Sequence, residues 1–140
     1  MILDTNVVSE MMRGDPTGTV SAWLATCEDA TLGIAAVTVQ EITFGLERMA
    51  RGVRQQRLAE AWSMVNNELD MYVHPLTTLT AQTAALLQAR REESGRHLGV
   101  GDAQIAATAI VHGHSLATRN VRDFEGLGLD LVDPWGDDGP

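Results

Sequence analysis

The 140-residue chain is 44% hydrophobic and has a formal net charge of −9, which suits one domain with a core of its own. No apolar run approaches the roughly 18 residues that a membrane span needs, and Cys27 is the single cysteine, which excludes an intrachain disulfide and a thiolate metal site. We therefore expect one cytoplasmic domain over residues 1–135, followed by an acidic, solvated and disordered tail over residues 136–140.

The basic residues are all arginine, ten in number, and the chain has no lysine. This excludes chemistry that needs an ammonium group, such as a Walker lysine, a Schiff-base lysine or a kinase strand lysine. The excess of acids also opposes unaided binding to a phosphate backbone. A nucleic-acid substrate therefore requires a metal ion or local arginines.

The first half of the chain alternates short apolar runs with helical periodicity. A strand at residues 2–3 ends at Asp4, and helices are predicted over residues 6–12 and 19–28. A second strand is predicted over residues 32–36. The Thr-x-x-Glu spacing of Thr38 and Glu41 then predicts a capping box at the start of a helix that ends near Gly52.

The second half continues the alternation. Helices are predicted over residues 53–69 and 80–94, and a third helix opens at Asp102 and ends near Gly113. Short strands are predicted at residues 71–74, 115–117 and 129–132. This order predicts an α/β domain with a mainly parallel sheet and helical crossovers.

Four acids fall where the strands of such a sheet end and the helices begin: Asp4, Glu41, Asp102 and Asp123. Ligands of open parallel sheets bind at this edge. Each acid also has a structural interpretation, as an Asx turn for Asp4, a capping box for Glu41, an N-cap for Asp102 and a surface partner of Arg119 for Asp123.

The convergence of four carboxylates favours a bound cation, because carboxylates at one edge repel one another and raise one another's pKa. Oxygen ligands without cysteine favour Mg²⁺ or Mn²⁺ over zinc. Such ions activate water and stabilise a leaving oxygen in phosphodiester hydrolysis. We therefore expect Asp4, Glu41, Asp102 and Asp123 to be both catalytic and metal-binding.

Several segments together resemble a family: MILDTNVVSE at residues 1–10, Glu41, VGDAQIAATA at 100–109 and ATRNVRDF at 117–124. In this order and spacing they are similar to a PIN domain of the VapC type. The resemblance implies a three-layer α/β/α sandwich, a homodimer, and a Mg²⁺- or Mn²⁺-dependent endoribonuclease toxin that a cognate antitoxin inhibits. It also implies that Asp4, Glu41 and Asp102 are the core acids.

The fourth acidic position departs from the family pattern. Many members have aspartate at one or both ends of the segment that here runs from Asn120 to Asp123, and only Asp123 is acidic in this chain. Asn120 offers an amide oxygen without charge, which leaves one-metal and two-metal mechanisms open. By the same resemblance Thr5, Asn6, Thr118 and Asn120 support the ligands or face phosphate; the alternative is that they are turn and cap residues.

Two other enzyme classes fit poorly. A phosphatase of the haloacid-dehalogenase type has Asp-x-Asp near its N-terminus, whereas position 6 here is Asn6, and a receiver domain needs a lysine. The remaining alternative is a non-catalytic PIN-like module that binds a partner protein or nucleic acid.

Overall fold

The computed structural model describes residues 1–68 and 72–136 of the chain. The predicted tail lies outside the described residues except for Gly136, and so do the predicted helix end at position 69 and strand start at position 71. The described elements are, in chain order, β1 (Ile2–Leu3), α1 (Thr5–Arg13), α2 (Thr19–Ala25), β2 (Gly33–Ala35), α3 (Ala36–Glu47), α4 (Val53–Glu68), β3 (Tyr72–His74), α5 (Thr78–Glu93), α6 (Val100–His112), β4 (Leu116–Ala117), α7 (Val121–Phe124) and β5 (Leu131–Val132).

The strands form one sheet in the order β3-β2-β1-β4-β5, and every described pairing is parallel. Ile2 of β1 pairs with Gly33 of β2 on one side and with Leu116 of β4 on the other. The chain therefore leaves β1 at the centre of the sheet, and the carboxyl ends of β1, β2 and β4 meet at one edge.

Side chains of a strand alternate between the two faces of the sheet. Ile2 and Leu3 of β1 accordingly belong to opposite hydrophobic clusters, and so do Ala35 and Ile34 of β2. One cluster contains buried residues of α5, α6 and α7; the other contains buried residues of α1, α2 and α3 and partly buried residues of α4.

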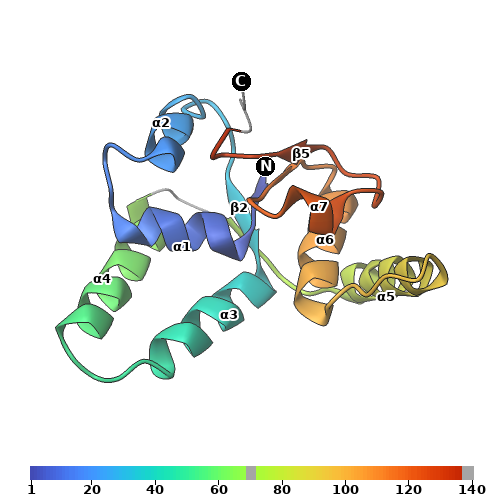
Figure 1. Cartoon of the computed structure of the whole chain (residues 1–140), viewed down its shortest axis with the longest axis horizontal. Coiled ribbons are helices and arrows are strands. Elements are labelled where there is room, and N and C mark those ends of the chain that lie inside the picture. Colours follow the sequence, from blue (N-terminus) through green and yellow to red (C-terminus); the bar gives the residue numbers. More distant parts are fainter. Residues whose placement is uncertain (69–71, 137–140) are drawn as a thin grey trace.

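The helices form two layers with the sheet between them. Figure 1 shows α1, α2 and α4 on one side and α5, α6 and α7 on the other. Alanines of α6, among them Ala103, Ala106 and Ala107, are fully buried, which lets this helix approach the sheet and α5 closely. The predicted three-layer α/β/α sandwich with a parallel sheet is thus confirmed.

Two predicted helix starts are wrong. Helix α3 begins directly after β2, with Ala35 as its N-cap, so Thr38 and Glu41 form no capping box. The hydroxyl of Thr38 is instead buried and accepts a hydrogen bond from Thr5, 3.2 Å away. Helix α6 begins at Val100 with Gly99 as its N-cap, so Asp102 is not a cap but the third residue of the helix. The short helix α7 was not predicted.

Three histidines cluster at the C-terminal end of α6. The ring of His74 lies 4.2 Å from that of His112 and 5.8 Å from that of His114, measured between centroids. Burial, followed by the charges of these neighbours, lowers the pKa of His74. Ten residues of helix, about 15 Å, separate His112 from Asp102, so these histidines do not take part in the acidic edge.

No helix in the described part of the chain is both long and apolar enough to cross a membrane.

Candidate active site

Asp4 follows β1 and is the N-cap of α1. Its Oδ1 accepts the backbone N–H of Thr5 at 2.7 Å, and its Oδ2 accepts the hydroxyl of Thr118 at 2.6 Å. The residue is 5% exposed, and burial raises its pKa, an effect that these hydrogen bonds partly offset. A capping role and a ligand role are compatible, because a carboxylate has about four lone-pair sites.

Thr118 connects Asp4 to the segment after β4. Its hydroxyl oxygen accepts the backbone N–H of Asn120 at 3.0 Å while its proton goes to Asp4. Asn6 contacts the same segment, since its Oδ1 accepts the N–H of Arg119 at 3.4 Å. The polar residues expected around Asp4 are therefore assembled at the carboxyl ends of β1 and β4.

Glu41 lies in the second turn of α3, where the hydroxyl of Thr5 is 3.3 Å from its Oε1. That hydroxyl has one proton, so it donates either to Glu41 or to Thr38 at a given moment. Gly101 of α6 makes room for the carboxylate, because a Cβ at this position would lie 3.3 Å from Glu41 Oε1. Sequence reasoning missed Gly101; a glycine inside a helical pattern beside an expected ligand is the available signal.

Asp102 faces the same charges from the first turn of α6. Burial raises its pKa first, and the charges of Asp4 and Asp123 raise it further. The pKa of Glu41 is likewise raised by burial and by the charges of Asp4 and Asp102, while Thr5 lowers it. Acids from four separate places in the chain therefore repel one another at one edge of the sheet.

Asp123 is the outlying acid. It is exposed on α7 and lines a neighbouring cavity of about 560 Å³ together with Arg119 and Asn120. Among the described residues it makes no ion pair with Arg119. Its charge nevertheless raises the pKa of Asp4 and of Asp102, so it lies within electrostatic reach of both.

A cavity of about 410 Å³, which we call the acid cavity, holds most of these groups. Sequence reasoning missed Ser9 and Arg13, which follow Thr5 at intervals of four residues and so share one face of α1; that spacing is the signal that would have found them. The lining residues are Asp4, Thr5, Asn6, Ser9, Glu10, Arg13, Glu41, Asp102, Arg119, Asn120 and Trp135.

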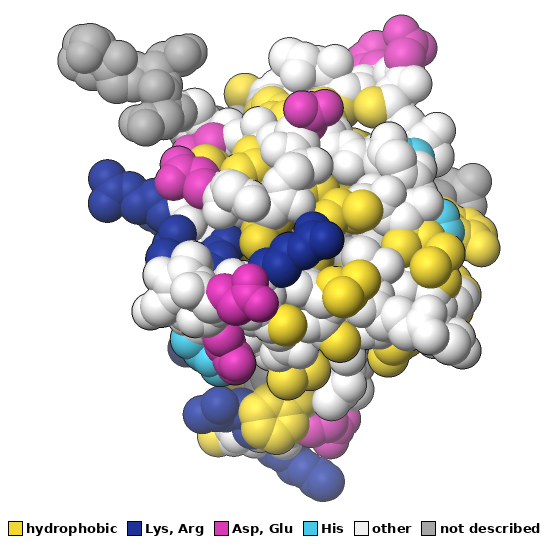
Figure 2. Space-filling model, turned by 90° about the vertical axis from the view of Figure 1, so that its right-hand side faces the viewer, with side chains coloured by type: hydrophobic (Ala, Val, Ile, Leu, Met, Phe, Trp, Pro, Cys, Tyr) yellow, Lys and Arg dark blue, Asp and Glu magenta, His cyan; other side chains and the backbone are white. Residues whose placement is uncertain are grey.

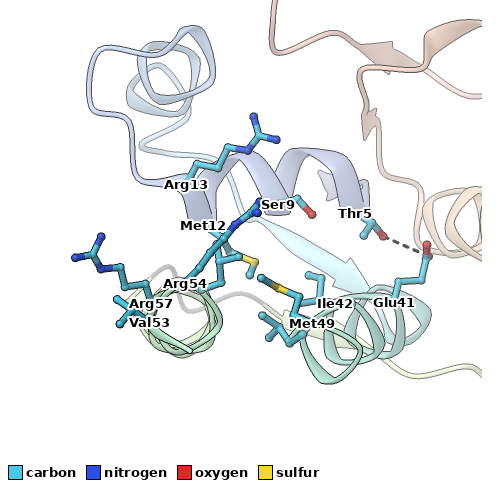
Figure 3. Close-up of a pocket in the computed structure, with 13 residues that line it drawn as sticks. Thr5, Ser9, Met12, Arg13, Glu41, Ile42, Met49, Val53, Arg54 and Arg57 are labelled. Carbon is cyan, nitrogen blue, oxygen red and sulfur yellow. Dashed lines mark hydrogen bonds between the residues drawn. The ribbon is translucent and has the colours of Figure 1, made fainter. Parts of the chain in front are cut away.

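A larger cleft of about 730 Å³ runs between α1, α3 and α4 and shares Thr5 and Glu41 with the acid cavity (Figure 3). We call it the α1–α4 cleft. Apolar side chains line most of it, and arginines from α1 and α4 lie at its rim. It shares Ser9 and Arg13 with the acid cavity as well, and its other lining residues are Met12, Ile42, Gly45, Leu46, Met49, Val53, Arg54, Arg57 and Leu58.

The acid cavity offers carboxylate, hydroxyl and amide oxygens and no histidine or cysteine, a donor set that suits Mg²⁺ or Mn²⁺. Within residues 1–68 and 72–136, no three His, Cys, Asp or Glu side chains are close enough to hold one ion together. Mg²⁺ commonly uses one or two carboxylates and completes its octahedron with water and substrate phosphate. The residues therefore fit an open cation site and not a closed protein cage.

A family model described as PIN domain matches residues 1–128. The VapC ribonuclease Y4jK of Sinorhizobium fredii is 39% identical over 139 residues, covering 96% of this chain and 97% of that protein. Toxin FitB of Neisseria gonorrhoeae is 29% identical, covering 98% and 99%. The solved structure of FitAB bound to an IR36 DNA fragment superposes with a TM-score of 0.84 at 29% identity, over 96% of this chain and 95% of that one.

These similarities extend along nearly the whole chain and agree with the parallel sheet and the acidic edge described above. They confirm the resemblance that the sequence suggested. The chain belongs to the PIN-domain family, among the VapC-type endoribonuclease toxins.

Proposed function

We propose that this chain hydrolyses RNA phosphodiester bonds with Mg²⁺ or Mn²⁺ held by Asp4 and Asp102, and that Glu41 and Asp123 are the further acids of the site. The observation that carries the proposal is that Asp4, Glu41 and Asp102 line one cavity, where burial and then the charge of a neighbouring carboxylate raise the pKa of each. Carboxylates held together in this way destabilise a fold unless a cation neutralises them.

A bound cation supplies activated water and neutralises charge on the leaving oxygen. The chain's own residues prepare the site for it. Thr5 and Thr118 hold the Asp4 carboxylate in one orientation through its two oxygens. Glu41, with its raised pKa and its place in the acid cavity, is the group suited to accept a proton from the attacking water.

The side of the site near α7 should bind a cation less tightly, because Asn120 contributes no charge and Asp123 lies outside the acid cavity. We propose a second, weaker cation position there, whose affinity an RNA phosphate would raise by adding a ligand. Trp135 lines the acid cavity, and the Cζ atom of Arg119 lies over its ring, 5.2 Å from the ring centroid. These contacts support a nuclease domain that extends to residue 135.

RNA binding by an acidic chain depends on where its arginines lie. Arg13 lines both cavities, while Arg54 and Arg57 of α4 line the α1–α4 cleft and Arg119 lines the acid cavity. These side chains can contact phosphates on either side of the scissile bond. Recognition in this arrangement depends on backbone and shape more than on base stacking.

Metal binding is the first expected property. Mn²⁺ at a hundredfold excess over its Kd adds about 2.7 kcal/mol of stability, a rise in Tm on the order of 10 °C for a domain of this size. Asp4→Asn removes this rise, although asparagine still caps α1. Thermal unfolding with and without Mn²⁺ measures the effect. Asp29→Asn serves as the control, because Asp29 is exposed and does not line the acid cavity.

In the metal-free protein the same repulsion should make the stability depend on pH. A carboxyl whose folded pKa is raised contributes stability below its unfolded pKa and loses it as pH rises through the folded pKa. Asp4→Asn should therefore raise the metal-free Tm at about pH 7.5 and give little advantage near pH 4. A Tm indifferent to both Mn²⁺ and Asp4→Asn would favour the non-catalytic binding module.

RNA cleavage is the second expected property. The purified chain, free of any antitoxin, should cleave single-stranded RNA, and EDTA should abolish the cleavage. Asp102→Asn should lower kcat by at least about a hundredfold, the upper end of what loss of a ligand's supporting residue does. His112→Ala, at the other end of α6, should retain activity. Cleavage that persists in EDTA would contradict the metal mechanism.

A cognate antitoxin is the partner that we propose for the α1–α4 cleft. The cleft has an apolar lining and opens beside Glu41, so an amphipathic segment bound there would also block the acid cavity. Met12 lines the floor of the cleft and is itself a core residue, whereas Met11, Trp23, Leu24 and Trp62, partly buried against the same core, do not line it.

A substitution at Gly45 tests this cleft. Gly45 lies in α3 with open space around its Cβ position, so Gly45→Arg introduces a large side chain without a clash. We expect it to weaken binding of the cognate antitoxin at least about tenfold, or 1.4 kcal/mol. Gly52→Arg, also in open space but outside the cleft, is the matched control. Equal affinity of the two variants in calorimetry would reject this docking site.

Helix α5 carries the surface that we propose for a homodimer. Leu79 and Leu86 are seven residues apart, lie on one face and are each 58% exposed. Figure 2 looks onto this side of the molecule and shows hydrophobic side chains among charged ones. Large exposed apolar patches commonly mark interfaces.

Light scattering tests the dimer. The wild-type chain should have twice the mass of the 15.1 kDa monomer, and Leu79→Glu with Leu86→Glu should shift it to the monomer. Ala81→Glu adds a charge at an exposed position of α5 that is two residues from Leu79 and five from Leu86, and therefore on a different face, and it should leave the dimer intact. A monomeric wild type would refute the homodimer.

A further inference from the structure

Helix α7 carries Asp123 but is only four residues long. A helix of this length has almost no internal hydrogen bonds, so contacts with the rest of the fold must hold it in place. Phe124, which is 1% exposed, anchors one side of α7 in the core. The two ends of the helix are held by separate hydrogen bonds.

Arg91 near the end of α5 and Arg96 in the loop that follows α5 hold the C-terminal end of α7. Arg91 donates from Nη1 to the carbonyl of Asp123 at 3.1 Å and from Nη2 to the carbonyl of Glu125 at 3.0 Å. Arg96 donates from Nη2 to the carbonyl of Arg122 at 3.1 Å. These guanidinium groups satisfy carbonyls that have no partner within such a short helix. Their positive charge also lies at the negative end of the helix dipole.

The environment of Arg91 is unusual for a charged side chain. It is 5% exposed, and it forms no ion pair in the part of the chain that the structure describes. A well-packed apolar side chain would fill a buried position at lower cost than an unpaired charge. What arginine adds is a planar fork that reaches two carbonyls at once.

The N-terminal end of α7 is linked to the acid cavity. The N–H of Asn120 donates to the hydroxyl oxygen of Thr118, which in turn donates to Asp4. Helix α7 is therefore fixed to Asp4 at one end and to Arg91 at the other. The place of the Asp123 carboxylate relative to the other acids depends on both attachments.

We infer that Arg91 is a positioning residue for the second cation position, because its hydrogen bonds to α7 set where the Asp123 carboxylate lies relative to Asp4 and Asp102. This inference rests on the proposed function, in which Asp123 belongs to the metal site. Arg91 itself is buried and lines neither the acid cavity nor the cavity beside Asp123.

Equilibrium Mn²⁺ binding, followed by electron paramagnetic resonance of the free ion, tests the inference. Arg91→Lys keeps the charge but cannot bridge two carbonyls, so we expect it to weaken the Asp123-dependent Mn²⁺ binding about tenfold, as loss of a ligand's supporting contact commonly does. Arg90→Lys changes the adjacent, exposed arginine of the same helix and should leave the Mn²⁺ affinity unchanged.

A double-mutant cycle separates positioning from general destabilisation. If Arg91 acts through Asp123, Arg91→Lys should add nothing to the loss of Mn²⁺ affinity already caused by Asp123→Asn. Losses that add in full, or an unchanged affinity in Arg91→Lys, would overturn the inference. If Arg91→Lys does not fold, the exposed Arg96→Lys should show a smaller loss in the same direction, and no loss there would overturn it.

Asp4→Asn distinguishes this failure from failure of the proposed function. If Asp4→Asn abolishes Mn²⁺ binding while Arg91→Lys has no effect, only the role of Arg91 is wrong. If Mn²⁺ binding survives Asp4→Asn, the metal site itself is wrong.

Discussion

The hydrogen bond from Thr118 to Asp4 joins residues that are 114 positions apart at the carboxyl edge of the sheet. A buried carboxylate is tolerated only where donors satisfy it. The parallel pairing of β1 with β4 brings these donors together, because it sets the end of one strand beside the end of the other. The cap of α1, the segment before α7 and the acid cavity all depend on this contact.

The same edge is the least favourable part of the fold in the metal-free state. Burial raises the pKa of Asp4, Glu41 and Asp102, and the charge of at least one other acid of this edge raises each of them further. A fold selected for stability alone would not bring these groups together. Sites that violate local stability rules are commonly functional, and here a cation would relieve the violation.

Arginines serve two different purposes in this chain. Arg91 and Arg96 donate hydrogen bonds to main-chain carbonyls of α7 and of the residue after it. Arg54 and Arg57 instead lie at the rim of the α1–α4 cleft, which adjoins the acid cavity (Figure 3). An overall charge of −9 thus coexists with local positive charge beside the cavity that we propose for RNA.

The sequence by itself determined the α/β class and the order of the main elements, and it indicated Asp4, Glu41, Asp102 and Asp123 as candidate ligands, because hydrophobic periodicity and the ends of strands are local properties. Tertiary structure decided the rest. The predicted capping box of Thr38 and Glu41 did not form because α3 already begins at Ala36, and the Thr38 hydroxyl instead accepts a hydrogen bond from Thr5, 33 residues away. Helix α7 is too short for periodicity to reveal, and the contact of Arg91 with it joins residues 32 positions apart. Which partner a polar side chain finds is settled by distances that exist only after the chain has folded.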